Sequence, residues 1–415
     1  MKRMQYLSLI SLVFIAACTP TTSSSPLSSS SLPALPNVVI SKLFTATSTR
    51  NNLIELYNPT DASLALDGLT LDFYGNGSPT ITAQIPLTGT LTAGQYFVIG
   101  GNNHDLNDVK DKMDLVYSTG SLPFNGNDAI RLSLGERVID AMGTIGFDID
   151  YSTNQTLIRL GDKASYQASE TFHRFQFISY LPNLFQYLKN DLHEIKTHEQ
   201  LYAGPQLEFR YGNYPFVQAG STTIGGGGYV QTTNTSIADG DTATFSPSGA
   251  FPGSSVRYYY INTPEVDGNY VRAEPWGYVA SKYNKQFIMR NASQSTFQIQ
   301  SIMGGPLKEV NNRALALVWV NGQLAQFLIV REGLSEDVAT EFTTIDLNLH
   351  YKNVPFLYYL QYAENIAKTN GWGTKGYPSN PNGEKSPDWN YLANGGVGAL
   401  ANTNPDWQPK IPLDW

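Results

Sequence analysis

Polar side chains stand at two turns in the second half of the chain, and two arginines lie in or just before neighbouring strand-like runs. The set consists of Asp239, Asp241, Arg257, Asn262, Thr263, Glu265 and Arg313. Carboxylate, amide and backbone carbonyl oxygens are the ligands that a hard divalent cation prefers. Pro264 fixes the bend after the run "YYYIN", so the polar groups stand at the mouth of a strand. The pattern indicates a metal or phosphate site.

Two strands would have to position these side chains. The turn at 239–242 leads into the first strand. In the next strand Arg257, Tyr259 and Ile261 are expected to share one face, because side chains alternate with a period of two. If the two strands pair, the turns at 239–242 and 262–265 converge on one pocket.

Three helices and a further strand are expected after these turns. Helical spacing assigns to the core Trp276, Ala280, Tyr283 and Phe287. Arg313 stands just before a strand, where it could reach the same pocket. That strand continues through an Asn-Gly turn at 321–322 into a helix that ends near Gly333. The last helix, 354–371, is amphipathic and stops at a glycine.

This order of motifs resembles the thermonuclease, or staphylococcal nuclease, family. The matching motifs are "DGDT" (239–242), "R-x4-NTPE" (257–265), "PWGYxAS" (275–281), "NNRALALVWVNG" (311–322) and "IVREGL" (329–334). Together they cover about residues 229 to 371, the predicted nuclease-like domain. The resemblance implies a small OB-like β-barrel with three helices.

The resemblance also implies a calcium site. Asp241 and the backbone carbonyl of Thr263 would be ligands, and Asp239 a nearby carboxylate. Asn262 stands where the best-known form of the family has aspartate. An amide carbonyl still coordinates calcium but adds no charge, so weaker binding and weakened activity are expected.

The same resemblance assigns the catalytic roles. Glu265 would orient or deprotonate the attacking water, while Arg257 and Arg313 would clamp the phosphate and stabilise the transition state, as arginine forks can. A tyrosine typical of the family is replaced by Asn311, and for the second stacking tyrosine Tyr351 is the candidate. Since stacking contributes about 1–3 kcal/mol per base, substrate affinity is expected to suffer more than the chemistry.

The first half of the chain is predicted to be all β. Short apolar or alternating runs are separated by Asn, Gly, Asp and Pro, which is typical of a two-sheet sandwich. Residues 37–150 resemble the lamin-tail domain, an immunoglobulin-like sandwich. The motifs are "IELYNP" (54–59), "GLTL" (68–71), "AGQY" (93–96) and "VIDAMG" (138–143). The resemblance implies no reaction for this domain, and its partner is unknown.

The N-terminus has the features of a lipoprotein signal peptide, residues 1–17. Lys2 and Arg3 precede a short apolar segment that ends in a lipobox-like sequence before Cys18, the one cysteine of the chain. Lipidated Cys18 would anchor the protein to a membrane outside the cytoplasm. The Ser/Pro-rich segment 18–36 reads as a tether.

Three further segments carry weaker signals. Residues 151–228 are an extension and linker, and the His, Asp and Glu side chains of 191–199 indicate a solvated helix face rather than a metal site. In the tail, 372–415, the tryptophans are expected to dock on the body. The net charge of -8 argues against a large basic surface for nucleic acid, so contacts would come from local arginines and a bound cation.

These observations predict a mainly β, multidomain, monomeric enzyme of the cell envelope. It would be a calcium-dependent phosphodiesterase, or endonuclease, with DNA as substrate and RNA as a further candidate. Two alternatives remain. The nuclease domain could be catalytically degenerate and bind nucleic acid or a partner at the surface. The protein could also be an adhesion or structural lipoprotein in which the sandwich and the tail are the functional parts.

Overall fold

The computed structural model describes residues 34–246, 251–253, 255–266, 274, 276–290, 295–339, 347–376, 407–411 and 413. The predicted signal peptide, Cys18 and most of the tether lie outside these residues, so lipidation stays a prediction. Within the described part of the chain, no helix is both long enough and apolar enough to cross a bilayer.

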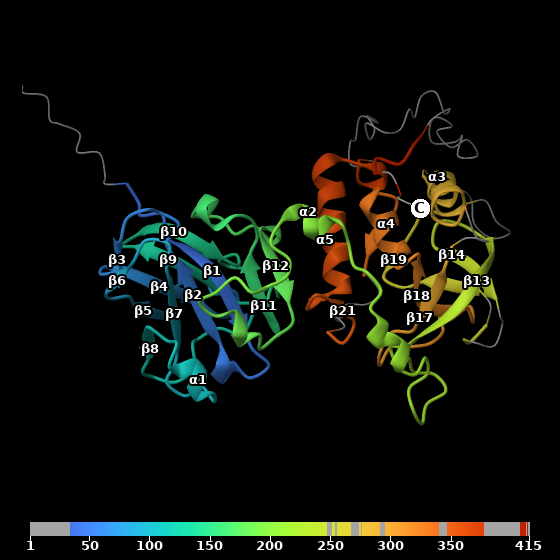
Figure 1. The fold of residues 1–415 in the computed structure, drawn as a ribbon. Helices are drawn as coiled ribbons and strands as arrows, with labels where there is room; N and C mark the ends of the chain where they lie inside the picture. Colours follow the sequence, from blue (N-terminus) through green and yellow to red (C-terminus); the bar gives the residue numbers. More distant parts are fainter. Residues whose placement is uncertain are drawn as a thin grey trace, which may run out of the picture. The chain divides into compact units, whose positions relative to one another are not determined.

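The first half of the described chain is a β-sandwich, as predicted (Figure 1). One sheet has the strand order β12 (Phe177–Tyr180), β11 (Gln155–Arg159), β1 (Val39–Thr45), β2 (Leu53–Tyr57), β7 (Tyr96–Gly101) and β8 (Leu115–Tyr117). The other has the order β10 (Arg137–Met142), β9 (Ala129–Leu134), β4 (Leu69–Tyr74) and β5 (Ala83–Pro86). A small pair, β3 (Leu64–Ala65) with β6 (Thr90–Leu91), and helix α1 (Asn107–Lys110) lie in the connections.

The sandwich motifs lie where the strands need them. The "IELYNP" run lies on β2 and continues into the turn after it, and the glycines before β4 and β7 adopt left-handed backbone conformations, with φ of 88° at Gly68 and 64° at Gly94. The first sheet continues past residue 150, where the sequence analysis ended the sandwich. Strand β1 pairs with β2 along one edge and with β11 along the other, where Leu43 lies opposite Leu157. Strand β12 then pairs with β11, so the sheet extends to Tyr180.

A buried ion pair lies inside this sheet. Lys42 Nζ is 2.7 Å from Glu55 Oε1, and the two side chains are 2% and 0% exposed. Lys42 also donates to the carbonyls of Tyr187 and Asn190, while Lys189 N donates to Glu55 Oε2. Burial raises the pKa of Glu55 and lowers the pKa of Lys42. The pair therefore fastens the segment after β12 to the centre of the sandwich.

Replacing Glu55 alone by alanine should destabilise the protein by about 3–5 kcal/mol, because Lys42 would stay buried without its counter-ion. Chemical unfolding followed by tryptophan fluorescence and circular dichroism would measure the loss. The double variant Lys42→Met, Glu55→Leu should be clearly more stable than Glu55→Ala, since it removes both charges and keeps the volume. Equal losses in the two variants would mean that the charges do not matter here.

The second half contains a closed β-barrel, which confirms the predicted OB-like fold. Its strands, in order around the barrel, are β13 (Tyr229–Ile237), β14 (Thr242–Ser246), β15 (Ser255–Tyr258), β18 (Ala314–Val320) and β17 (Phe297–Gln300). The ring closes because β15 pairs with β14 on one side and in parallel with β18 on the other, while β17 joins β18 to β13. Short pairs complete the sheet region: β19 (Gln323–Leu324) on β18, β16 (Ile261–Asn262) with β20 (Asp337–Val338), and β21 (His350–Tyr351) with β22 (Val354–Pro355).

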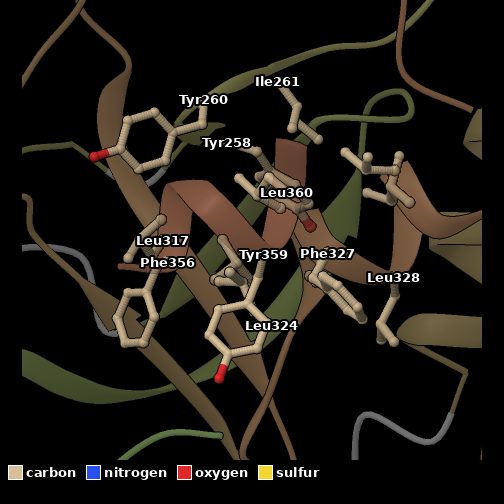
Figure 2. Packing of buried hydrophobic residues seen from close by; sticks show 14 of the residues in the cluster. Tyr258, Tyr260, Ile261, Leu317, Leu324, Phe327, Leu328, Phe356, Tyr359 and Leu360 are labelled. Carbon is tan, nitrogen blue, oxygen red and sulfur yellow. The ribbon is translucent and has the colours of Figure 1, made fainter. Parts of the chain in front are cut away.

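The three predicted helices are present. Helix α3 (Gly277–Lys282) continues as a π-helical turn over Tyr283–Ile288, α4 spans Ala325–Arg331, and α5 spans Phe356–Asn370. Asn321 and Gly322 form the predicted turn, with φ of 50° and 80°, and α5 ends at Gly371 with φ of 63°. Helices α4 and α5 pack on each other, and Figure 2 shows their side chains, among them Phe327, Phe356 and Tyr359, inside the core.

Two segments near the barrel are fixed by close contacts. The glycine run before β13 is packed, since a Cβ on Gly225 would lie 2.2 Å from the carbonyl oxygen of Ile302. In the tail, Trp407 is 4% exposed and packs edge-on against Tyr283. The docking predicted for the tail tryptophans is confirmed for Trp407, whereas Trp389 and Trp415 lie outside the described residues.

The polar side chains of 191–199 have separate partners. Asp191 pairs with Lys163, and His198, at the start of the short helix α2 (His198–Tyr202), contacts the hydroxyl of Tyr362. His193 is 7% exposed and lies between the rings of Tyr180 and Tyr187. The prediction of a solvated helix face is therefore wrong for His193, because the extension folds back and buries this ring.

His193 should make the protein sensitive to acid. Burial lowers its pKa from 6.5 to about 4, so between these values the unfolded chain binds a proton that the folded chain does not. Stability should fall as the pH drops through this window, by up to about 3 kcal/mol at pH 4. Unfolding curves at pH 4 to 7 would show a smaller decline for His193→Phe than for wild type, with His198→Gln as the control. Parallel declines in all three would assign the sensitivity to other groups.

Candidate active site

The barrel strands bring two of the sequence-predicted residues into direct contact. Thr242 on β14 is paired with Arg257 on β15, which places Asp241 beside the guanidinium. Arg257 Nη1 forms an ion pair with Asp241 Oδ1, and Arg257 Nη2 donates to Asn262 Oδ1. The Asp241 side chain is 3% exposed and that of Arg257 is 17% exposed. One arginine fork therefore links the two turns that carry the polar groups.

The remaining oxygen of Asp241 holds the second turn. Thr263 donates to Asp241 Oδ2 from its backbone N at 2.7 Å and from its hydroxyl at 3.0 Å. Glycine is needed at position 240, because a Cβ there would lie 2.5 Å from Thr263 Oγ1 and 2.8 Å from the Ala280 Cβ. The close approach of these backbones fixes the distance between the turns and α3.

Arg313 reaches the same place from the third strand. Its Nη1 donates to Thr242 Oγ1 at 3.2 Å. The Thr242 hydroxyl in turn donates to Asp241 Oδ1 at 3.2 Å. Glu309 holds the base of the guanidinium, with Arg313 Nε 3.0 Å from Glu309 Oε1. The structure thus brings Arg313, Arg257 and Asp241 together although they are distant in the sequence.

Asp239 and Glu265 complete the charged group. Asp239 Oδ1 accepts a hydrogen bond from Asp241 N at 3.0 Å. Burial raises the pKa of Asp239, while Arg257 lowers it. Burial also raises the pKa of Glu265, and the charge of Asp239 raises it further. A cation beside these carboxyls would stabilise the ionised forms that burial disfavours.

A turn that interrupts the strand directs these side chains. The predicted alternation of Arg257, Tyr259 and Ile261 on one strand is wrong, because Tyr259 and Tyr260 form a turn between β15 and β16. Tyr260 has a φ of 72°, a conformation that costs about 1–3 kcal/mol outside glycine. Figure 2 shows its ring at the edge of the packed cluster. The turn redirects the chain so that Asn262 faces Arg257.

An open pocket of about 630 Å³ adjoins this group. Its walls include Arg257, Tyr260, Asn262, Lys308 and Arg313. Two arginines and a lysine line it, with Glu309 and Asp337 as the acidic members, so cationic donors for a phosphate are in slight excess. Tyr260 adds an aromatic side chain to the wall. The pocket is large enough for a nucleotide-sized ligand.

Several contributing residues were missed by the sequence analysis. Glu309 supports Arg313 and Glu336 contacts Asn262, and neither belongs to a motif quoted above. Thr242, which also contacts Arg313, lies in the "DGDT" motif, but no role was predicted for it. Tyr351, the candidate stacking residue, instead lies in β21 and packs against Tyr359 with ring centroids 6.4 Å apart.

The donor set fits a hard cation if backbone and water complete it. Within the described residues, no three His, Cys, Asp or Glu side chains gather closely enough to hold a metal by themselves. Asp241 and Asp239 supply carboxylates, and calcium accepts carbonyl and water oxygens for its other positions. The buried carboxylate of Asp241, 3% exposed and next to Asp239 in the same turn, is the observation that favours a cation here.

Comparison with known proteins assigns both domains. Residues 32–146 match the family model described as Lamin Tail Domain, and residues 255–368 match the model of staphylococcal nuclease homologues. The chain carries a lamin tail domain followed by a staphylococcal nuclease-like domain. The match to the nuclease model includes Arg257, Asn262, Glu265 and Arg313, whereas the turn with Asp239 and Asp241 precedes it.

Two similar proteins come from Bacillus subtilis (strain 168). Over 97 residues the chain is 33% identical to the SPbeta prophage-derived endonuclease YokF and 32% identical to Endonuclease YncB. The matches cover 23% of this chain, but only 30% of the first relative and 43% of the second. The similarity therefore extends over part of each protein.

Proposed function

We propose that this protein is a nuclease that hydrolyses phosphodiester bonds in DNA, with RNA as a second substrate class. The observation that carries the proposal is the meeting of Asp241, Arg257 and Arg313 beside a pocket of about 630 Å³. The nuclease-like domain and the two similar endonucleases support it.

The residues divide the chemistry between them. Arg257 and Arg313 would direct guanidinium donors toward the phosphate oxygens, where charge develops in the transition state. Glu265, which is half-buried and whose pKa burial raises, would accept a proton from the attacking water. Thr263 and Glu309 would hold Asp241 and Arg313 in position through the hydrogen bonds described above.

Calcium is the proposed cofactor. Asp241 and Asp239, with the Thr263 carbonyl, would hold it, and the Asn262 carbonyl would contribute without charge. When bound, a calcium ion would neutralise the phosphodiester and polarise water. The residue at 262 is expected to weaken calcium binding relative to a carboxylate, since affinity follows the charge of the ligands.

Calcium removal provides the direct test. Purified protein should digest added DNA in millimolar calcium and stop when excess EGTA is added, with activity restored by fresh calcium. The products should be resolved on gels for both DNA and RNA. Digestion that continues in excess chelator would refute this mechanism.

One observation favours a second candidate. Arg257 already forms an ion pair with Asp241 and a hydrogen bond with Asn262, which are two of the proposed calcium ligands. A catalytically degenerate domain could therefore bind nucleic acid or a partner without cleaving it. DNA binding in calcium with no cleavage by the wild-type protein would support this interpretation.

The location is a proposal as well: lipidated Cys18 would tether the enzyme outside the cytoplasm. Membrane extraction of wild type and Cys18→Ser would test it.

A further inference from the structure

The side-chain amide of Asn262 lies between a cation and a carboxylate. Its Oδ1 accepts from Arg257 Nη2, and its Nδ2 donates to Glu336 Oε2 over 3.3 Å. A guanidinium can only donate hydrogen bonds and an ionised carboxylate can only accept them. Both neighbours therefore select the same orientation of the amide, with the oxygen toward Arg257.

The backbone keeps Glu336 beside Asn262. Glu336 N donates to the Asn262 carbonyl over 2.7 Å, and Ser335 Oγ donates to the same oxygen over 3.1 Å. Strand β20 continues the pairing, with Val338 opposite Ile261. Although the Glu336 side chain is exposed, its starting point is fixed by the sheet.

The contact matters most when substrate binds. Under the proposed function, Arg257 turns toward the phosphate and gives up part of its contact with Asn262. Among the contacts described for this amide, the bond to Glu336 would then be the one that keeps Oδ1 directed into the site. An aspartate at 262 would need no such help, because its two oxygens are equivalent acceptors.

We propose that Glu336 is a positioning residue that keeps the carbonyl end of Asn262 directed into the active site. The inference rests on the proposed function. It makes Asn262 and Glu336 an interdependent pair, in which the amide donates outward to Glu336 and accepts inward. A carboxylate at both positions would place like charges at hydrogen-bonding distance, so the neutral residue at 262 suits the acid at 336.

The test compares Glu336→Ala with Glu336→Gln. Both remove the same charge, but glutamine keeps an oxygen that can accept from Asn262 Nδ2. Two quantities are compared in the wild-type background: kcat/KM for DNA, and calcium affinity measured by calorimetry. Each should be lower in Glu336→Ala than in Glu336→Gln by at least about threefold. In the Asn262→Asp background the difference should shrink to about twofold or less, because a carboxylate has no end to orient. Glu136→Gln, an exposed position of the sandwich, controls for loss of an acidic charge outside the site.

A third measurement needs neither calcium nor DNA. In protein labelled with 15N-asparagine, the Asn262 side-chain resonances are identified by their loss in Asn262→Asp. They should move in Glu336→Ala and stay close to wild type in Glu336→Gln. Equal behaviour of the two Glu336 variants in this spectrum and in calcium affinity would overturn the proposal. If wild type binds calcium but leaves DNA intact, the proposed function fails, while the resonance shifts still decide the role of Glu336.

Discussion

Replacing Glu265 by glutamine is expected to lower the rate of DNA cleavage by about 10²- to 10⁴-fold, the usual contribution of a general base. Glutamine has nearly the same shape but cannot accept the proton of the attacking water. Because burial and Asp239 raise the pKa of Glu265, the wild-type rate should rise with pH through a value above that of an ordinary glutamate. Initial rates on labelled duplex DNA at several pH values would measure both effects.

Two variants sharpen this prediction. Asp239→Asn removes the charge that raises the pKa of Glu265, so the acid limb of its pH profile should move to lower pH. Asp337→Asn changes an exposed carboxylate on β20 and should leave the acid limb in place. A Glu265→Gln protein that cleaves DNA within tenfold of the wild-type rate would place the base elsewhere.

The residues of the candidate site could be named from the sequence, but their contacts could not. The turns at 239–242 and 262–265 have distinctive residue types, and these identify the nuclease-like domain. The pairing of Thr242 with Arg257 depends on which strands close the barrel, a long-range property that local patterns do not contain. The roles of Glu309 and Glu336 follow from folded geometry alone, since isolated acidic residues on a surface have no signature.

The fold shows the same division. The Asn321-Gly322 turn and the glycine stop of α5 were predictable because each needs a left-handed backbone conformation. The break at Tyr260 was not, since a tyrosine in this conformation is held by its surroundings rather than by its own preference. The predicted sandwich ended at residue 150, so strands β11 and β12 fell outside its bounds. Their place in the sheet depends on pairing with the second edge of β1, which is a long-range property.

Replacing Arg257 by lysine should reduce DNA cleavage by about 10²- to 10³-fold, comparable to the loss of one transition-state donor. The guanidinium of Arg257 reaches Asp241 with one nitrogen and Asn262 with the other. A lysine ammonium keeps the charge, but it is a single point and cannot span two acceptors in a fixed fork. The variant therefore tests geometry rather than charge. Steady-state kinetics would show whether the loss falls on kcat, as expected for a contact made in the transition state.

Two comparisons separate catalysis from folding. Arg50→Lys changes an arginine of the sandwich whose side chain is 58% exposed, and it should cleave DNA like the wild type. Thermal unfolding of Arg257→Lys should show only a modest loss, because lysine still offers a positive charge to buried Asp241. If the rate and the unfolding midpoint fell together, the arginine would be a structural counter-ion of Asp241. If the rate alone fell, the fork would belong to the chemistry, and the ion pair with Asp241 would be the resting position from which Arg257 turns to the phosphate.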